Sequence, residues 1–162
     1  MAQNFALAQN LLAASILSPA TDAAGRTGRY VTMKNSHKGF FVAHINQGNA
    51  ATILLSVLQA TDPTGTGSKA LANNARIWFI TDDSVANPAW VRQTDAVSFT
   101  TDAGVKVKAV LIEVDGAMLD LVNGFNCVSI STGASNVANI TEAMFYGTAR
   151  SAEDAAPSPR VA

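Results

Sequence analysis

The pattern of hydrophobic and polar positions changes near residue 30. Before that point, residues 3–17 contain no glycine, proline or charged residue, and Phe5, Leu12 and Ile16 recur at spacings of seven and four, with Leu11 beside them. This periodicity predicts an amphipathic helix. Because isolated helices this short are marginal in water, the segment needs a partner surface, either its own domain or a neighbouring subunit. A secretory signal is disfavoured, because the charged region that begins such signals is missing.

From residue 30 onward, short apolar runs alternate with turn residues, which is typical of an all-β domain. The clearest predicted strand is 52–60, where Ile53, Leu55 and Val57 fill one face. Leucines occupy its other face, so the strand is either sandwiched or part of an interface. The other predicted strands are residues 30–34, 40–46, 76–80, 90–100, 105–114, 126–131 and 142–148. We therefore predict a mostly β fold, an antiparallel sandwich or barrel of about eight strands.

Two local features refine this prediction. The tripeptide Asp102-Ala103-Gly104 indicates a hairpin turn, because glycine accepts the positive φ that such turns need. The apolar phase of 105–114 shifts near Ala109 and Val110, which a β-bulge or burial of both faces would explain.

Breaks in the pattern divide the chain into three parts. Residues 18–29 contain one proline and two glycines and are typical of a linker. The segment from residue 151 has two prolines and mixed charge, which predicts an extended tail. We expect an N-terminal helix or extended arm with its linker (1–29), a β-domain (30–150) and a C-terminal tail (151–162).

Composition excludes several function classes. The 162 residues favour one domain. Charged residues make up 14% of the chain, well below the usual quarter, and the net charge is −1. This balance argues against a nucleic-acid partner. No apolar run approaches the roughly 20 residues that span a bilayer, so we expect no membrane partner. Such an uncharged surface is often covered by another molecule.

Candidate catalytic and metal-binding residues are few. The only histidines, His37 and His44, lack metal-ligand spacing. We expect His37 to be solvated and His44 to be half-buried on the face that carries Phe40 and Val42. The single cysteine, Cys127, excludes an intramolecular disulfide framework and is expected to be a small buried hydrophobe.

Structural roles are also the favoured interpretation of the acidic residues. Glu113 and Asp115 lie two apart on a predicted strand and share one face, with Asp120 nearby. Calcium prefers such oxygen ligands, but turn capping or an intersubunit ion pair is the favoured interpretation. Capping is also expected of the aspartates at loop edges, which are Asp62, Asp82, Asp83, Asp95 and Asp102.

Motifs that would indicate an enzyme are missing from the sequence. Residues 65–69 (GTGSK) lack the Walker spacing, and there is no GxSxG elbow. We therefore predict a non-enzymatic protein with no catalytic residues, no metal and no cofactor.

Several stretches, taken in order, resemble small virion proteins of tailed bacteriophages that are encoded near the major capsid protein. They are Tyr30-Val31-Thr32-Met33-Lys34-Asn35, Leu58-Gln59-Ala60-Thr61-Asp62, Ile112-Glu113-Val114-Asp115, Gly124-Phe125-Asn126-Cys127-Val128 and Tyr146-Gly147-Thr148-Ala149-Arg150. The resemblance implies a capsid decoration (cement) or closely related head protein without catalytic residues. Its implied partners are the major capsid protein and further copies of itself, for example in a trimer, on the outer surface of the phage head.

The resemblance covers 30–150, so the role of the preceding segment follows from its apolar side chains alone. The residues expected to bind a partner are Phe5, Leu11, Leu12, Ile16, Tyr30 and Met33. Two alternatives stay open. One is a tail-tube or head–tail junction subunit. The other is a sugar-binding surface module that uses Trp90 and the loop 82–88, because exposed aromatic rings stack on sugar faces.

Overall fold

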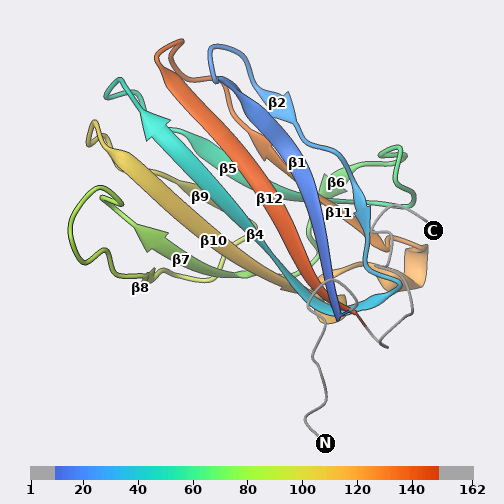
Figure 1. Cartoon of the computed structure of the whole chain (residues 1–162). Helices are drawn as coiled ribbons and strands as arrows, with labels where there is room; N and C mark the ends of the chain where they lie inside the picture. The colour runs from blue at the N-terminus through green and yellow to red at the C-terminus, as the bar shows by residue number, and fades with distance from the viewer. Residues whose placement is uncertain (1–9, 150–162) are drawn as a thin grey trace, which may run out of the picture.

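The computed structural model describes residues 10–149, which form two antiparallel sheets packed face to face (Figure 1). Sheet A has the strand order β1 (Leu11–Thr21), β12 (Asn139–Ala149), β4 (Ser36–Gln47), β10 (Val107–Asp115), β7 (Arg76–Ile80) and β8 (Val91–Arg92). Sheet B has the order β2 (Arg26–Thr27), β11 (Cys127–Thr132), β5 (Leu54–Ala60) and β6 (Lys69–Ala70), with β3 (Val31–Thr32) paired to β11 and β9 (Ser98–Thr100) paired to β5. The predicted mostly β sandwich is confirmed, and the two sheets do not close into a barrel.

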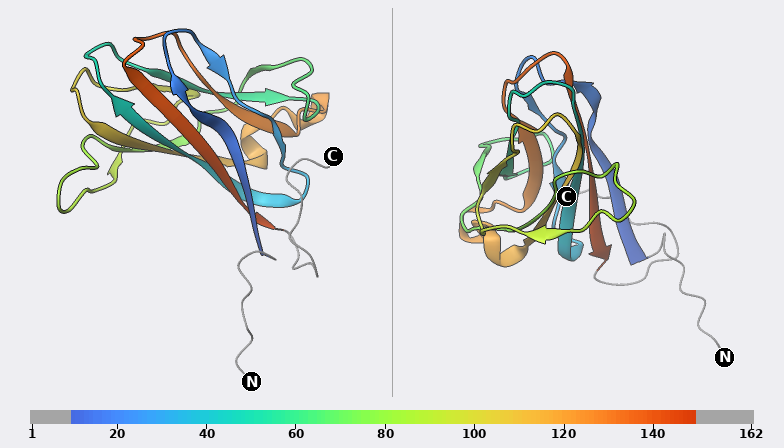
Figure 2. Two further views of the ribbon diagram at one scale, coloured as in Figure 1. Left: turned by 45° about the horizontal axis from the view of Figure 1, so that its top comes forward. Right: turned by 90° about the vertical axis from the view of Figure 1, so that its left-hand side faces the viewer.

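The core lies between the sheets because each long strand turns alternate side chains inward. In β4, Phe41, Ala43 and Ile45 are fully buried, whereas the intervening residues face outward. From sheet B, Leu55 and Val57 of β5 meet them, on the face that the sequence pattern predicted. Figure 2 shows the two sheets as separate layers.

The predicted N-terminal helix is wrong for residues 11–17, because these residues belong to strand β1. This strand pairs with β12 from Leu11↔Thr148 to Thr21↔Ile140. Leu12 and Ile16 lie four residues apart, which is also two full repeats of a strand, so both point into the core. A register shift between Ser15 and Leu17 then turns Leu17 inward as well. Residues 11–27, expected in an arm and linker, are thus part of the sandwich.

The connection between β9 and β10 also differs from the prediction. β9 pairs with β5 in sheet B, whereas β10 lies in sheet A, so residues 101–106 cross from one sheet to the other and do not form a hairpin. Gly104 accordingly has no positive φ. The predicted strand 90–100 is split between β8 and β9. Within β10, the pairing with β4 is continuous and Lys108, Ala109 and Val110 are all buried, so burial of both faces explains the phase shift.

The two ends of the sandwich carry different loops. We call one of them the loop end; it contains segments 22–25, 48–53, 101–106 and 133–138 and runs from the top to the upper left of Figure 1. The opposite end contains the turn before β4 and the two short 3-10 helices, η1 (Gly116–Met118) and η2 (Leu121–Asn123). From Lys38 to Gln47, β4 extends about 30 Å from the second end to the first.

Candidate functional site

The loop end exposes apolar side chains that the core does not use. Val137 is 65% exposed and Val105 is 58% exposed. Half of the large apolar side chains left exposed in the described part of the chain lie here, at or beside the loops; they are Leu54, Val105, Val107, Val137 and Ile140. Val107 and Ile140 flank Asn46 in adjacent strands of sheet A and line one shallow depression. Exposed apolar groups gathered in this way are typical of an interaction surface.

Formal charge is nearly missing from three of these loops. Segments 22–25, 48–53 and 133–138 contain a single charged residue, Asp22, and it is fully buried. Its carboxylate accepts hydrogen bonds from Arg26 (3.0 Å) and from the Thr141 hydroxyl (2.6 Å). A partner that meets these loops therefore contacts small side chains and main chain, with no exposed charge to desolvate on them.

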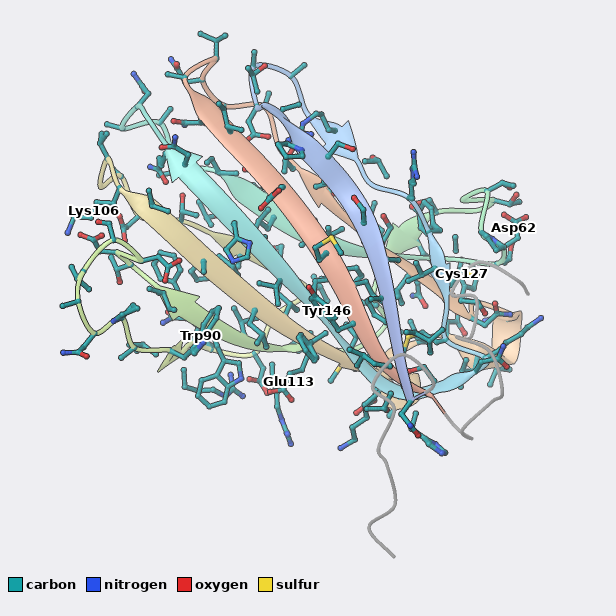
Figure 3. The ribbon with its side chains drawn as sticks, viewed as in Figure 1. Asp62, Trp90, Lys106, Glu113, Cys127 and Tyr146 are labelled. Atoms are coloured by element: carbon teal, nitrogen blue, oxygen red, sulfur yellow. The ribbon has the colours of Figure 1, made fainter. Side chains whose placement is uncertain are left out.

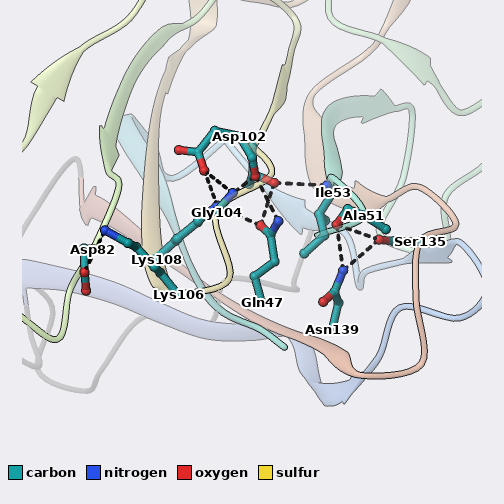
Figure 4. Close-up of polar contacts among 11 residues, drawn as sticks. Gln47, Ala51, Ile53, Asp82, Asp102, Gly104, Lys106, Lys108, Ser135 and Asn139 are labelled. Carbon is teal, nitrogen blue, oxygen red and sulfur yellow. Dashed lines mark hydrogen bonds and ion pairs between the residues drawn. The ribbon is translucent and has the colours of Figure 1, made fainter. Parts of the chain in front are cut away.

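A buried lysine joins the end of β4 to one segment of the loop end. The ammonium group of Lys108 is shielded from solvent and donates to the Gln47 Oε1 (3.0 Å), the Asp102 carbonyl (2.8 Å) and the Asp102 carboxylate (2.6 Å), as Figure 4 shows. All three donors of the ammonium are thus used. Burial raises the pKa of Asp102, but hydrogen bonds from Lys108 and from the Gly104 amide outweigh this and leave it below its ordinary value.

Two further sets of hydrogen bonds fix the loops relative to one another. Thr101 donates its hydroxyl to the Gln47 Oε1 (2.9 Å) and accepts the Ile53 amide (3.0 Å). Asn139 donates its side-chain amide to the Ala51 carbonyl (2.8 Å) and to the Ser135 hydroxyl (2.9 Å; Figure 4). Val105 and Val137 therefore stand on loops whose shape is set before any partner arrives, which lowers the entropic cost of binding.

The outer face of sheet A holds a second feature, the outer-face groove. The strand register places Tyr146, Phe40, Glu113 and Arg76 in one row across β12, β4, β10 and β7. This row and its neighbours line a concave site of about 390 Å³, within the range of small-molecule sites. Figure 3 shows Tyr146 and Glu113 on this face of the sheet.

Side chains in the groove are held by specific contacts. The rings of Phe40 and Tyr146 are stacked, with centroids 5.4 Å apart and planes inclined by 29°. The Trp78 indole Nε1–H donates to the Glu113 Oε1 at 2.9 Å, and the Arg76 guanidinium lies 3.9 Å from the other carboxylate oxygen. The groove thus combines an aromatic platform with oriented charged groups.

The residues expected to bind a partner are mostly buried in the protein's own core. Leu12, Ile16, Tyr30 and Met33 are all at least 95% buried, and Leu11 is partly exposed at the start of β1. The expectation that these four side chains face a partner is therefore wrong, because sandwich formation uses them. Phe5 lies outside the described residues.

The loop-end valines and Ile140 were not among the residues predicted from the sequence. An apolar residue beside a turn has the same sequence pattern whether it is buried or exposed, so only the tertiary structure distinguishes the two. Trp90, expected in a sugar-binding loop, is 40% exposed. Asp82 and Asp83, in the same loop, make hydrogen bonds within the protein. The Asp82 carboxylate accepts the Ser84 amide, and the Asp83 amide donates to the Val107 carbonyl.

The candidate chemical residues all lie within the described part of the chain. His37 is exposed, and the His44 side chain is 50% exposed, 3.5 Å from Glu142. Cys127 is buried, and desolvation raises the pKa of its thiol. Asp115 caps η1 by accepting the Ala117 amide (2.9 Å), which confirms capping.

Residues 10–149 form neither a cluster of metal ligands nor a helical membrane span. This part of the chain contains no group of three or more His, Cys, Asp or Glu side chains placed to hold a metal ion. None of its helices is long and apolar enough to cross a membrane.

Comparison with known proteins gives distant structural similarities. No family model and no curated protein matches the sequence. The SPBc2 prophage-derived protein YomS is similar over 86% of this chain and 94% of its own, with a TM-score of 0.47 and 8% identity. The CBM22-2 xylan-binding domain of Xyn10C from Paenibacillus barcinonensis is similar over 89% of this chain and 92% of its own, with a TM-score of 0.28 and 11% identity. At these scores neither similarity transfers a function, and the assignment depends on the geometry of the chain itself.

Proposed function

We propose that this chain is a non-enzymatic structural protein of a bacteriophage particle, a capsid decoration protein that binds the outer surface of the assembled head through its loop end. The major capsid protein is the proposed partner. The observation that carries the proposal is the set of exposed apolar side chains at the loop end, where three of the four loop segments expose no charged side chain.

The chemistry of the loop end fits a protein partner. The cores of protein interfaces are depleted of charge and closely packed. Val137 and Ile140 supply apolar contact area, while residues 133–138 supply main-chain groups. A protein that binds only the assembled shell stabilises it by mass action, by about 2.7 kcal/mol per site at a free concentration of about 100 times the Kd. Repetition over a shell of identical sites multiplies this contribution without any reactive group.

The proposal includes self-association, such as a trimer around a local symmetry axis of the shell, because closed symmetric arrangements are the usual form of repeated protein contacts. The resemblance of residues 30–150 to small head proteins of tailed phages supports a place on the head. A tail-tube or head–tail junction subunit would be present as rings and not spread over the head, so copy number separates the two roles.

Binding to undecorated heads tests the proposal. We would compare the unaltered chain with Val137→Asp and Ile140→Asp, using heads from a phage that lacks the gene and measuring co-sedimentation. Each substitution places a charge in the proposed interface and should weaken binding by at least about tenfold. The matched control is Val122→Asp, because Val122 is 97% exposed at the opposite end.

The control variant should bind like the unaltered chain, and thermal unfolding should show that all three variants keep the fold. Full-strength binding by both loop-end variants would contradict the proposed docking surface. Failure of the unaltered chain to bind heads at all would contradict the proposed function.

A further inference from the structure

We propose that the outer-face groove is a binding site for an uncharged polysaccharide chain. The groove is separate from the loop end: it uses the first residues of β4, whereas the loop end begins after the last. From Phe40 in the groove to Asn46 beside the loop-end depression, β4 extends about 20 Å. A protein docked through its loop end therefore keeps the groove accessible, and the site does not depend on what the loop end binds.

The floor of the groove is an aromatic and aliphatic platform. The stacked rings of Phe40 and Tyr146 lie side by side on β4 and β12, and Leu111 extends the apolar surface onto β10. The axial C–H groups of a pyranose ring carry partial positive charge and lie favourably over the electron-rich face of an aromatic ring. A platform of this kind recognises the shape of a sugar ring and leaves its equatorial hydroxyls to polar groups at the sides.

Side chains that can accept hydrogen bonds and side chains that can donate them surround this platform. Glu113 is fixed by the Trp78 N–H through one oxygen, and its other oxygen is 3.9 Å from Arg76, too far for a hydrogen bond, so it keeps the capacity to accept one. Among residues 10–149, neither the Lys38 ammonium nor the Tyr146 hydroxyl has a hydrogen-bond or ion-pair partner, although both residues line the groove. A sugar hydroxyl both donates and accepts, so one ligand class satisfies acceptors and donors together.

The charge balance selects the class of ligand. Two cationic residues, Lys38 and Arg76, and two acidic residues, Glu113 and Asp115, line the groove, so its formal charge is zero. An anionic polymer would meet the carboxylates and a cationic one the basic groups. Burial under a protein partner would desolvate four charges, and interface cores are depleted of such residues. An uncharged, hydroxyl-rich chain avoids both costs.

Titration with defined oligosaccharides tests the site. The probes are neutral hexamers of β-linked glucose, mannose and N-acetylglucosamine, with hexagalacturonate as the anionic comparison, and binding is measured by isothermal titration calorimetry. At least one neutral hexamer should bind the unaltered chain. Tyr146→Leu removes half of the stacked platform, and Glu113→Gln removes the negative charge while keeping an acceptor for Trp78. Each should weaken binding by at least about tenfold.

The control variant is His44→Ala, because His44 lies on the same face of β4 but outside the groove. It should bind like the unaltered chain, and thermal unfolding should show that every variant is folded. The site is wrong if no neutral hexamer binds, if the two groove variants bind at full strength, or if hexagalacturonate binds more tightly than every neutral hexamer. Head binding by the same variants, measured separately, keeps this result distinct from the test of the loop end.

Discussion

Single residues determine whether the loop end keeps its shape. Lys108 is a charged side chain in a position that the strand pattern assigns to the core, and it is tolerated because Gln47 and Asp102 satisfy all three of its donors. Removal of one partner from such a network takes a hydrogen bond away from each of the others, and a buried polar group that loses a partner is costly. The buried Lys108 and Gln47 side chains thereby support the proposed docking surface.

We predict that Lys108→Met lowers the free energy of unfolding by about 1–3 kcal/mol, because the buried Gln47 side chain and the Asp102 carbonyl lose a donor. Urea denaturation measures the change. Lys106→Met is the matched control, because Lys106 is two residues away and pairs with Asp82 at the surface, its side chain 48% exposed. Surface ion pairs of this kind contribute about 0–1 kcal/mol. Equal losses in the two variants would show that the network has no special role.

At the scale of elements, the sequence predicted strands best where one face is strongly apolar. The strand predicted at residues 76–80 has the same bounds as β7, because its short apolar run is flanked by polar residues that mark both ends. The split between β8 and β9 was missed, since the pairing of each with a different sheet is a long-range property. The same holds for the crossover at residues 101–106, where glycine and aspartate indicate a turn but not which strands it joins.

Strand β1 shows why periodicity alone misassigned an element. A spacing of four suits both a helix and two repeats of a strand, and the tertiary partner β12 decided between them. The site residues were missed for a related reason: an apolar residue beside a turn has the same sequence signature whether it points into the core or into solvent. Neither the loop end nor the row Tyr146–Phe40–Glu113 exists until distant strands pair.

If β1 is part of the sandwich, Leu12→Ala should lower the free energy of unfolding by about 2–5 kcal/mol, because Leu12 is 1% exposed and truncation leaves a cavity. Ser15→Ala on the outward side of the same strand should change it by less than about 0.5 kcal/mol. Thermal and urea unfolding of the two variants give the comparison. A negligible effect of Leu12→Ala would mean that residues 11–21 form an arm outside the core.

The whole molecule carries the two proposed binding surfaces on one sandwich. The loop end offers apolar side chains and main chain, while the far part of sheet A offers an aromatic groove with balanced charge. The separation along β4 allows one end to face a shell while the other faces the surroundings. The low overall charge fits this proposal, because an apolar docking surface does not require electrostatic steering of its partner.

A density map of the intact particle, from the phage that encodes the chain, tests this arrangement most directly. We predict many copies spread over the outside of the head, each with Val137 and Ile140 against the capsid shell and Tyr146 turned away from it. A map with this chain confined to one ring at the tail, with the groove pressed against the shell, or with no copy in the particle would contradict it.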